Sequence, residues 1–296
     1  MGNRQWITIA AASSLAAMAL AGQPSMAAPT AATPRIAAAA PVEIAQLEAA
    51  LRAGRHVQLK TLIERAKLAR QTDPLIDVYL GEYWLANGQA EQALGLFQSL
   101  TGNPRAAAHA HQGLGIAAFQ LGQVDKAHAA LGRAVELDPG FSRAWNALGA
   151  TADLRRDWAL AEKAYGEALR LDPASSAALS NRGFSRVLQG RYSDAVTDLT
   201  AAIRAQPGDG RVRNNLRVAL ALSGRYDEAF AGVNRRDLHR ELNNIGFVAL
   251  LRGDYVSAEA YLNRALETSD VFYRTAWRNL VYLGDLKPAV RLASAR

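Results

Sequence analysis

The sequence contains no cysteine among its 296 residues, and only 7% of them are aromatic. Without cysteine the chain forms no disulfide, holds no metal through thiolates, uses no cysteine nucleophile and carries no lipid on a cysteine. Aromatic residues are favoured in strands, whereas alanine, which is abundant here, is the best helix former. The composition therefore argues against an all-β protein. Because half of the residues are apolar, the chain can bury a sizeable core.

Long apolar runs are also scarce, since the sequence has a single one, between Trp6 and Ala21. A cation, Arg4, precedes this run, and small residues follow it, which predicts a secretory signal over residues 1–27. The run is shorter than the ~20 residues that span a bilayer. We therefore expect an exported, periplasmic protein that is not a lipoprotein and has no integral membrane segment once the signal is cleaved. Residues 28–40, rich in alanine and proline, are expected to form a flexible leader.

A period of 34 residues runs through the remaining sequence. In the copy that begins at residue 108, Leu114-Gly115 is followed by Gly122, Ala127 and Pro139, and similar residues recur at this interval on both sides. Each copy has two apolar runs with helical spacing, separated in most copies by a glycine. A glycine can end a helix in the left-handed conformation, and proline cannot continue one. Each copy is therefore predicted to be a pair of antiparallel helices, and stacked pairs bury the apolar faces.

These recurring residues resemble the tetratricopeptide repeat (TPR). The resemblance implies an all-α fold, an α-solenoid of about seven TPR-like helix pairs plus a closing helix, wound as a right-handed superhelix. The copies start near residues 40, 74, 108, 142, 176, 210 and 239. The solenoid would cover residues 41–286, with the closing helix at about Arg274–Leu286 and a tail at 287–296.

Two copies depart from the pattern. Arg156 stands at the turn glycine of the copy that begins at 142. In the copy that begins at 210, Arg217 replaces the glycine of the first helix and the final proline is absent. We expect a turn to interrupt the second helix of that copy, between Asp227 and about Arg236.

The sequence shows no constellation of catalytic or metal-binding residues. None of its five histidines has a partner at zinc-ligand spacing, such as a second histidine four residues away beside a glutamate. It has no Gly-Lys-Ser/Thr phosphate loop and no Gly-x-Ser-x-Gly nucleophile elbow. Asp138 and Asp172 precede the repeat proline, where they are expected to form loops. We therefore predict that the protein is not an enzyme and uses no cofactor and no metal.

The TPR resemblance implies a concave groove lined by the first helix of each pair. The groove residues that it predicts are amides, arginines and aromatic rings: Asn146, Asn181, Asn214, Asn215, Asn243, Asn244, Asn279, Arg143, Arg211, Arg240, Phe184 and Phe247. Amides donate and accept, so a ladder of them can pair with the backbone of an extended peptide, and arginine can hold a carboxylate. The alternative is that these positions form a solvated face of mixed charge. The expected partner is a protein or peptide segment, and no nucleic acid is expected because the chain is exported.

A longer segment, residues 242–255, has the sequence LNNIGFVALLRGDY and resembles the C-terminal part of the TadD proteins of bacterial tight-adherence (Flp) pilus systems. Residues 143–149, Phe272-Tyr273-Arg274 and residues 277–280 support the likeness. It implies a non-catalytic scaffold or adaptor that assists pilus assembly, with a pilus or secretin component as partner. Members of that family are often lipoproteins, and the missing cysteine argues against such an anchor here. The alternative is a periplasmic adaptor for envelope proteases or peptidoglycan enzymes. An enzymatic role is the interpretation that the residues support least.

Overall fold

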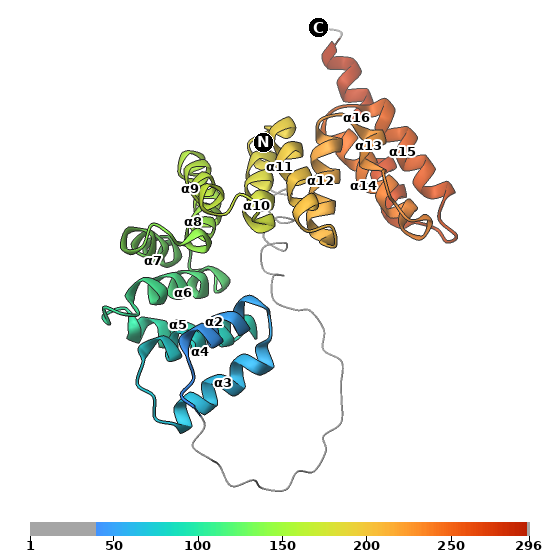
Figure 1. The fold of residues 1–296 in the computed structure, drawn as a ribbon. Helices are drawn as coiled ribbons and strands as arrows, with labels where there is room; N and C mark the ends of the chain where they lie inside the picture. The colour runs from blue at the N-terminus through green and yellow to red at the C-terminus, as the bar shows by residue number, and fades with distance from the viewer. Residues whose placement is uncertain (1–39, 295–296) are drawn as a thin grey trace, which may run out of the picture. The chain divides into compact units, whose positions relative to one another are not determined.

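The computed structural model describes residues 40–294, with side chains described to residue 286, and divides into two units after Asp157. The predicted secretory signal, and all of the predicted leader except Ala40, lie outside the described residues. Within residues 40–294 every regular element is helical, with fifteen α-helices and one 3-10 turn (Figure 1). The prediction of an all-α fold is therefore confirmed.

The first unit consists of three helix pairs and one further helix. Its helices are α2 (Ile44–Arg52), α3 (His56–Leu68), α4 (Pro74–Ala86), α5 (Ala90–Leu100), α6 (Ala107–Gln120), α7 (Val124–Leu137) and α8 (Ser142–Arg155). Neighbouring helices in the sequence pack on one another, and α4 also contacts α2 and α6. The helix starts agree with the predicted copies at 74, 108 and 142 to within one residue.

The second unit continues the same pattern. Its helices are α9 (Trp158–Leu171), α10 (Ser176–Leu188), α11 (Tyr192–Ala205), α12 (Gly210–Leu222), α13 (Tyr226–Ala229), the 3-10 turn η1 (Arg235–Asp237), α14 (Leu238–Leu251), α15 (Tyr255–Glu267) and α16 (Arg274–Ser294). The predicted interruption after Asp227 is confirmed, because α13 has only four residues. The closing helix α16 runs to Ser294 and not to the predicted Leu286. Pro288 removes one intrahelical hydrogen bond but does not end the helix.

Short turns with a left-handed residue join the two helices of most pairs. Gly122, after α6, has φ +72°, a conformation that glycine adopts without steric cost. Arg156 takes the same conformation, with φ 59°, at the end of α8. The turn geometry of the repeat is thus kept where the glycine is absent. The cost is steric strain, because the left-handed conformation brings the Cβ atom of an L-residue close to the following carbonyl oxygen.

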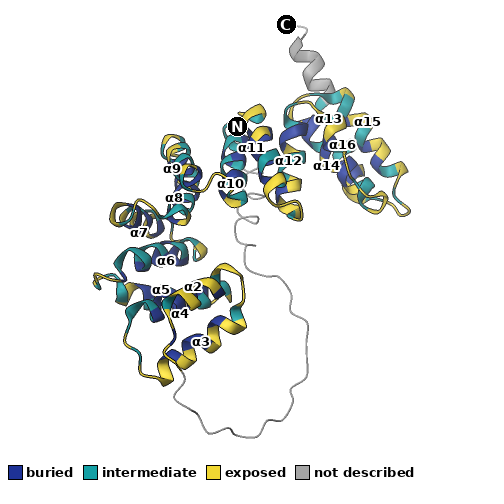
Figure 2. Ribbon diagram, in the orientation of Figure 1, coloured by how far each residue is buried: buried dark blue, intermediate teal, exposed yellow. Residues whose placement is uncertain are grey.

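Close helix packing depends on glycines that face large buried side chains. Phe97 on α5 is fully buried between Gly81 of α4 and Gly113 of α6. A Cβ atom on these two glycines would lie 2.5 Å and 2.3 Å from the ring Cζ. Figure 2 shows that buried residues occupy the sides of helices that face their neighbours, and exposed residues the other sides. The core of each unit is therefore a series of thin layers between helices, as expected for stacked pairs.

A partly buried ion network connects α9, α10 and α11 in the second unit. Asp198, 3% exposed, accepts hydrogen bonds from Arg182 at 2.8 Å and 2.7 Å and from Arg186 at 2.7 Å. Arg186 also donates to Glu162, which accepts a further bond from Arg191 at 3.1 Å. Burial alone would raise the pKa of Glu162, but the hydrogen bond from Arg186 and the neighbouring guanidinium charges together lower it. The network fixes the order and spacing of three consecutive helices.

Candidate partner-binding site

The predicted asparagines fall into different environments. In the second unit Asn214 of α12 and Asn244 of α14 are exposed, while Asn215 and Asn181 are half-buried. In the first unit Asn146 of α8 is half-buried. Exposed amides therefore follow one another on α12 and α14, which contact each other.

Two of the predicted groove asparagines bond to each other. Asn243 of α14 is only 5% exposed, and its Oδ1 accepts a hydrogen bond of 2.9 Å from Nδ2 of Asn279 on α16. The pair holds the closing helix against the preceding repeat. These two amides act within the fold, and the sequence did not indicate this because their bond spans 36 residues.

The three predicted arginines are each paired with a carboxylate. Arg143 of α8 donates to Glu82 of α4 at 2.7 Å, although 61 residues separate them. Arg211 pairs with Asp209 at 3.2 Å, and Arg240 with Asp237 at 3.2 Å. All three arginines remain about half exposed, so their outer donors stay accessible.

Glu82 was not among the predicted residues. Its side chain is 5% exposed, and Arg143 compensates the charge that burial would otherwise penalise. The same region contains Tyr79, where burial, followed by the charges of Glu48 and Glu82, raises the pKa to about 12. The position of a residue within its repeat does not reveal this ion pair, because the pair connects helices that are two repeats apart.

The predicted aromatic residues, Phe184 of α10 and Phe247 of α14, are half-buried. Each ring is therefore only partly accessible to a partner.

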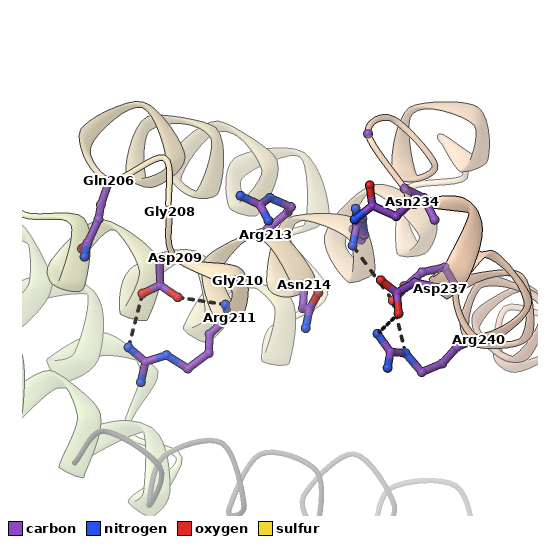
Figure 3. A pocket seen from close by; sticks show the side chains of 14 residues that line it. Gln206, Gly208, Asp209, Gly210, Arg211, Arg213, Asn214, Asn234, Asp237 and Arg240 are labelled. Carbon is purple, nitrogen blue, oxygen red and sulfur yellow. Dashed lines mark hydrogen bonds and ion pairs between the residues drawn. The ribbon is translucent and has the colours of Figure 1, made fainter. Parts of the chain in front are cut away.

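A pocket of about 600 Å³ lies in the second unit, beside the exposed amide of Asn214. The loop before α12, the first turns of α12, the turn after α13 and the start of α14 line it (Figure 3). Arg211, Arg213 and Arg240 lie around it, and the first and last of these point toward carboxylates of Asp209 and Asp237 (Figure 3). Mixed charge and amide groups therefore gather at one place on the predicted groove helices.

The carboxylate of Asp209 is held at the start of α12. Burial alone would raise its pKa, but the hydrogen bond from the Arg211 side chain, together with the backbone N–H groups of Arg211 and Val212, lowers it. The anion therefore both caps the helix and positions the guanidinium of Arg211 at the pocket.

The described residues show neither a metal cluster nor a membrane-spanning helix. The described residues contain no group of three or more His, Asp or Glu side chains that could hold a metal ion. Among the helices between residues 40 and 294, none combines the length and the apolar content that crossing a bilayer requires.

Comparison with known proteins identifies the repeat. A family profile described as tetratricopeptide repeat matches residues 113–176 and 185–238. No curated protein sequence matches the chain.

Solved structures share the fold. The crystal structure of the APC/C hetero-tetramer Cut9–Hcn1 superposes with a TM-score of 0.60 at 17% identity, covering 80% of this chain. The match takes in 48% of the Cut9–Hcn1 chain, so this protein spans about half the length of that relative. A thermophilic TPR protein of Thermus thermophilus superposes with a TM-score of 0.50 at 21% identity, covering 63% of this chain and 96% of the other. At these identities the similarity concerns the fold alone.

Proposed function

The chain carries tetratricopeptide repeats, and from that premise we propose that it is a non-catalytic scaffold of the bacterial envelope that holds an extended segment of a partner protein. Repeats of this kind generally mediate protein–protein interaction. The observation that carries the proposal is the succession of amides on α12 and α14, where Asn214 and Asn244 are exposed and Asn215 is half-buried. Such amides can pair with the N–H and C=O groups of a peptide backbone whatever its side chains.

The proposed setting is the assembly of a tight-adherence pilus. The support is the sequence likeness of residues 242–255 to TadD proteins and the signal-like residues 1–27. An adaptor for envelope proteases or peptidoglycan enzymes is the second candidate, because it would use the same amides after the same export.

The experiment is crosslinking in cells, with the crosslinked proteins identified by mass spectrometry. The chain is compared with the double variant Asn215→Ala plus Asn244→Ala and with Asn263→Ala. Asn263 is an exposed amide on α15, a second helix of its pair, and serves as the matched control.

We expect the double variant to lose a crosslink that the control retains. A secretin or pilus component as the lost partner supports the pilus role, and a protease or peptidoglycan enzyme supports the second candidate. If both variants recover every partner equally, the proposal that these groove amides bind the partner is refuted.

A further inference from the structure

The pocket of the second unit lies where the second helix of one repeat, α13, has only four residues. In three other pairs a glycine of the first helix packs against a leucine sixteen residues later: Gly115 with Leu131, Gly183 with Leu199, and Gly246 with Leu262. A Cβ on these glycines would lie between 2.5 Å and 2.8 Å from the leucine Cγ, so the two helices are in close contact. The space between them is filled.

In the pair that begins with α12, both partners of this contact are changed. The glycine is replaced by Arg217, and the residue sixteen positions later, Val233, lies in the turn that follows the short helix α13. Arg217 and Val233 both line the pocket. The pocket therefore lies where the second helix continues in the other pairs, and the long cationic side chain of Arg217 lines it.

Arg217 is incompletely paired at this place. Its side chain is 14% exposed, and its closest carboxylate contact is Nη1 to Oε1 of Glu241 at 4.0 Å. Its buried Nε has no hydrogen-bond partner among the described residues. Glu241 is shared with Arg240, whose Nε lies 3.8 Å from the same oxygen. A buried guanidinium with open donors favours a ligand that brings an acceptor.

The other charges around the pocket are more closely matched. Arg211 is bonded to Asp209, Arg240 pairs with Asp237, and Arg213 donates to the backbone oxygen of Pro207 at 2.8 Å. Four arginines and three carboxylates line the pocket, so its net charge is one positive. One carboxylate neutralises that charge, whereas a doubly charged phosphate monoester would exceed it.

We propose that this pocket receives an aspartate or glutamate side chain of the partner segment, and that Arg217 is the residue that binds it. The inference rests on the proposed function, since Asn214 belongs both to the pocket lining and to the exposed amides. The planar guanidinium matches a carboxylate in geometry, and burial strengthens the pairing. The shortened second helix thus turns a helix contact into a specificity site for acidic residues.

The experiment measures fluorescence anisotropy with the full 296-residue chain. The probe is a labelled peptide of alternating glutamate and glycine, compared with its twin in which glutamine replaces glutamate. The variant is Arg217→Met, which keeps the volume and removes the charge. The control is Arg225→Met on the turn before α13, which removes the same charge from an exposed arginine outside the pocket. Circular dichroism melts establish that both variants fold.

We expect the chain to bind the acidic peptide and to bind the glutamine twin about tenfold more weakly. Arg217→Met should weaken the acidic peptide about tenfold, and Arg225→Met should leave its affinity unchanged. Failure of the chain to bind the acidic peptide, equal binding of the two peptides, or equal losses in the two variants would overturn the proposal. Displacement of the probe by millimolar inorganic phosphate, beyond that by sodium chloride of the same ionic strength, would assign the pocket to phosphate instead.

The outcome is separable from that of the proposed function. If the crosslink still depends on Asn215 and Asn244 while Arg217→Met has no effect on binding of the acidic peptide, partner binding in the groove is supported and the acidic-residue site is refuted. If the acidic peptide binds through Arg217 and the crosslink is unaffected by the asparagine variants, the acidic-residue site is supported and partner binding by the amides is refuted.

Discussion

Replacing Gly113 by alanine tests the packing of the first unit directly. The ring of Phe97 lies between α4 and α6, and a Cβ on Gly113 would come within 2.3 Å of its Cζ. The ring cannot retreat toward α4, because a Cβ at Gly81 on that side would already lie 2.5 Å from it. The added methyl group must therefore separate helices or force the ring from its rotamer.

The size of the effect follows from two opposing contributions. Alanine is better than glycine in a helix by about 1 kcal/mol. Overpacking a closely filled core costs about 1–3 kcal/mol, and the upper part of that range applies because the ring is confined on both sides. We therefore expect the free energy of unfolding to fall by about 2 kcal/mol. Gly132 on α7 has nothing within 4 Å of its ideal Cβ, so Gly132→Ala should gain about 1 kcal/mol.

The assay is urea unfolding combined with hydrogen exchange, which measures the opening of α5 and α6 separately from the rest of the chain. A second substitution, Phe97→Leu, makes room for the methyl group. In that background Gly113→Ala should cost about 1 kcal/mol less than in the unaltered chain. If Gly113→Ala stabilises the chain as Gly132→Ala does, or if Phe97→Leu leaves its effect unchanged, the packing of Phe97 between two glycines is refuted.

Substitutions at other positions are expected to change the stability of the chain. Arg156→Gly should raise the free energy of unfolding by about 1 kcal/mol in thermal melts by relieving the left-handed arginine, whereas Gly122→Ala should lower it by a similar amount. Asp198→Asn removes the anion that pairs with Arg182 and one of the two anions that pair with Arg186, and should cost about 3 kcal/mol in urea unfolding, while Glu167→Gln, in an exposed ion pair, should be nearly silent. Because the pKa of Glu162 is lowered on folding, its contribution is complete above the unfolded value and is lost as the pH falls through the folded value, below the ordinary 4.5. Urea midpoints should therefore drop at acid pH, and less so in Glu162→Gln.

The sequence determines much of the fold because each repeat uses local contacts. The period places the glycines and alanines that let helices approach, and so the predicted starts at 142, 176 and 210 coincide with the observed ones. The interrupted second helix after Asp227 was also visible, since the final proline was missing there.

The candidate site was less predictable, because side-chain pairing depends on distances between repeats. Arg143 meets Glu82 across 61 residues, and Asn243 meets Asn279 across 36. The register assigned three of these four side chains to a partner, although the fold uses them. The pocket had one sequence signal, the arginine in place of a glycine at Arg217, but only the structure shows that this arginine lines a pocket beside the shortened helix α13.

The amide bond between Asn243 and Asn279 has a consequence for how the chain ends its stack. Leucines at these places would pack almost equally well with the last helix moved by one turn, because dispersion contacts are tolerant of sliding. The buried amide of Asn243 and the half-buried amide of Asn279 bond at one height only, and at any other height each would lose its partner. The amide pair therefore fixes the axial position of the final helix relative to α14. A hydrophobic contact would contribute more stability at this place but would not specify that position.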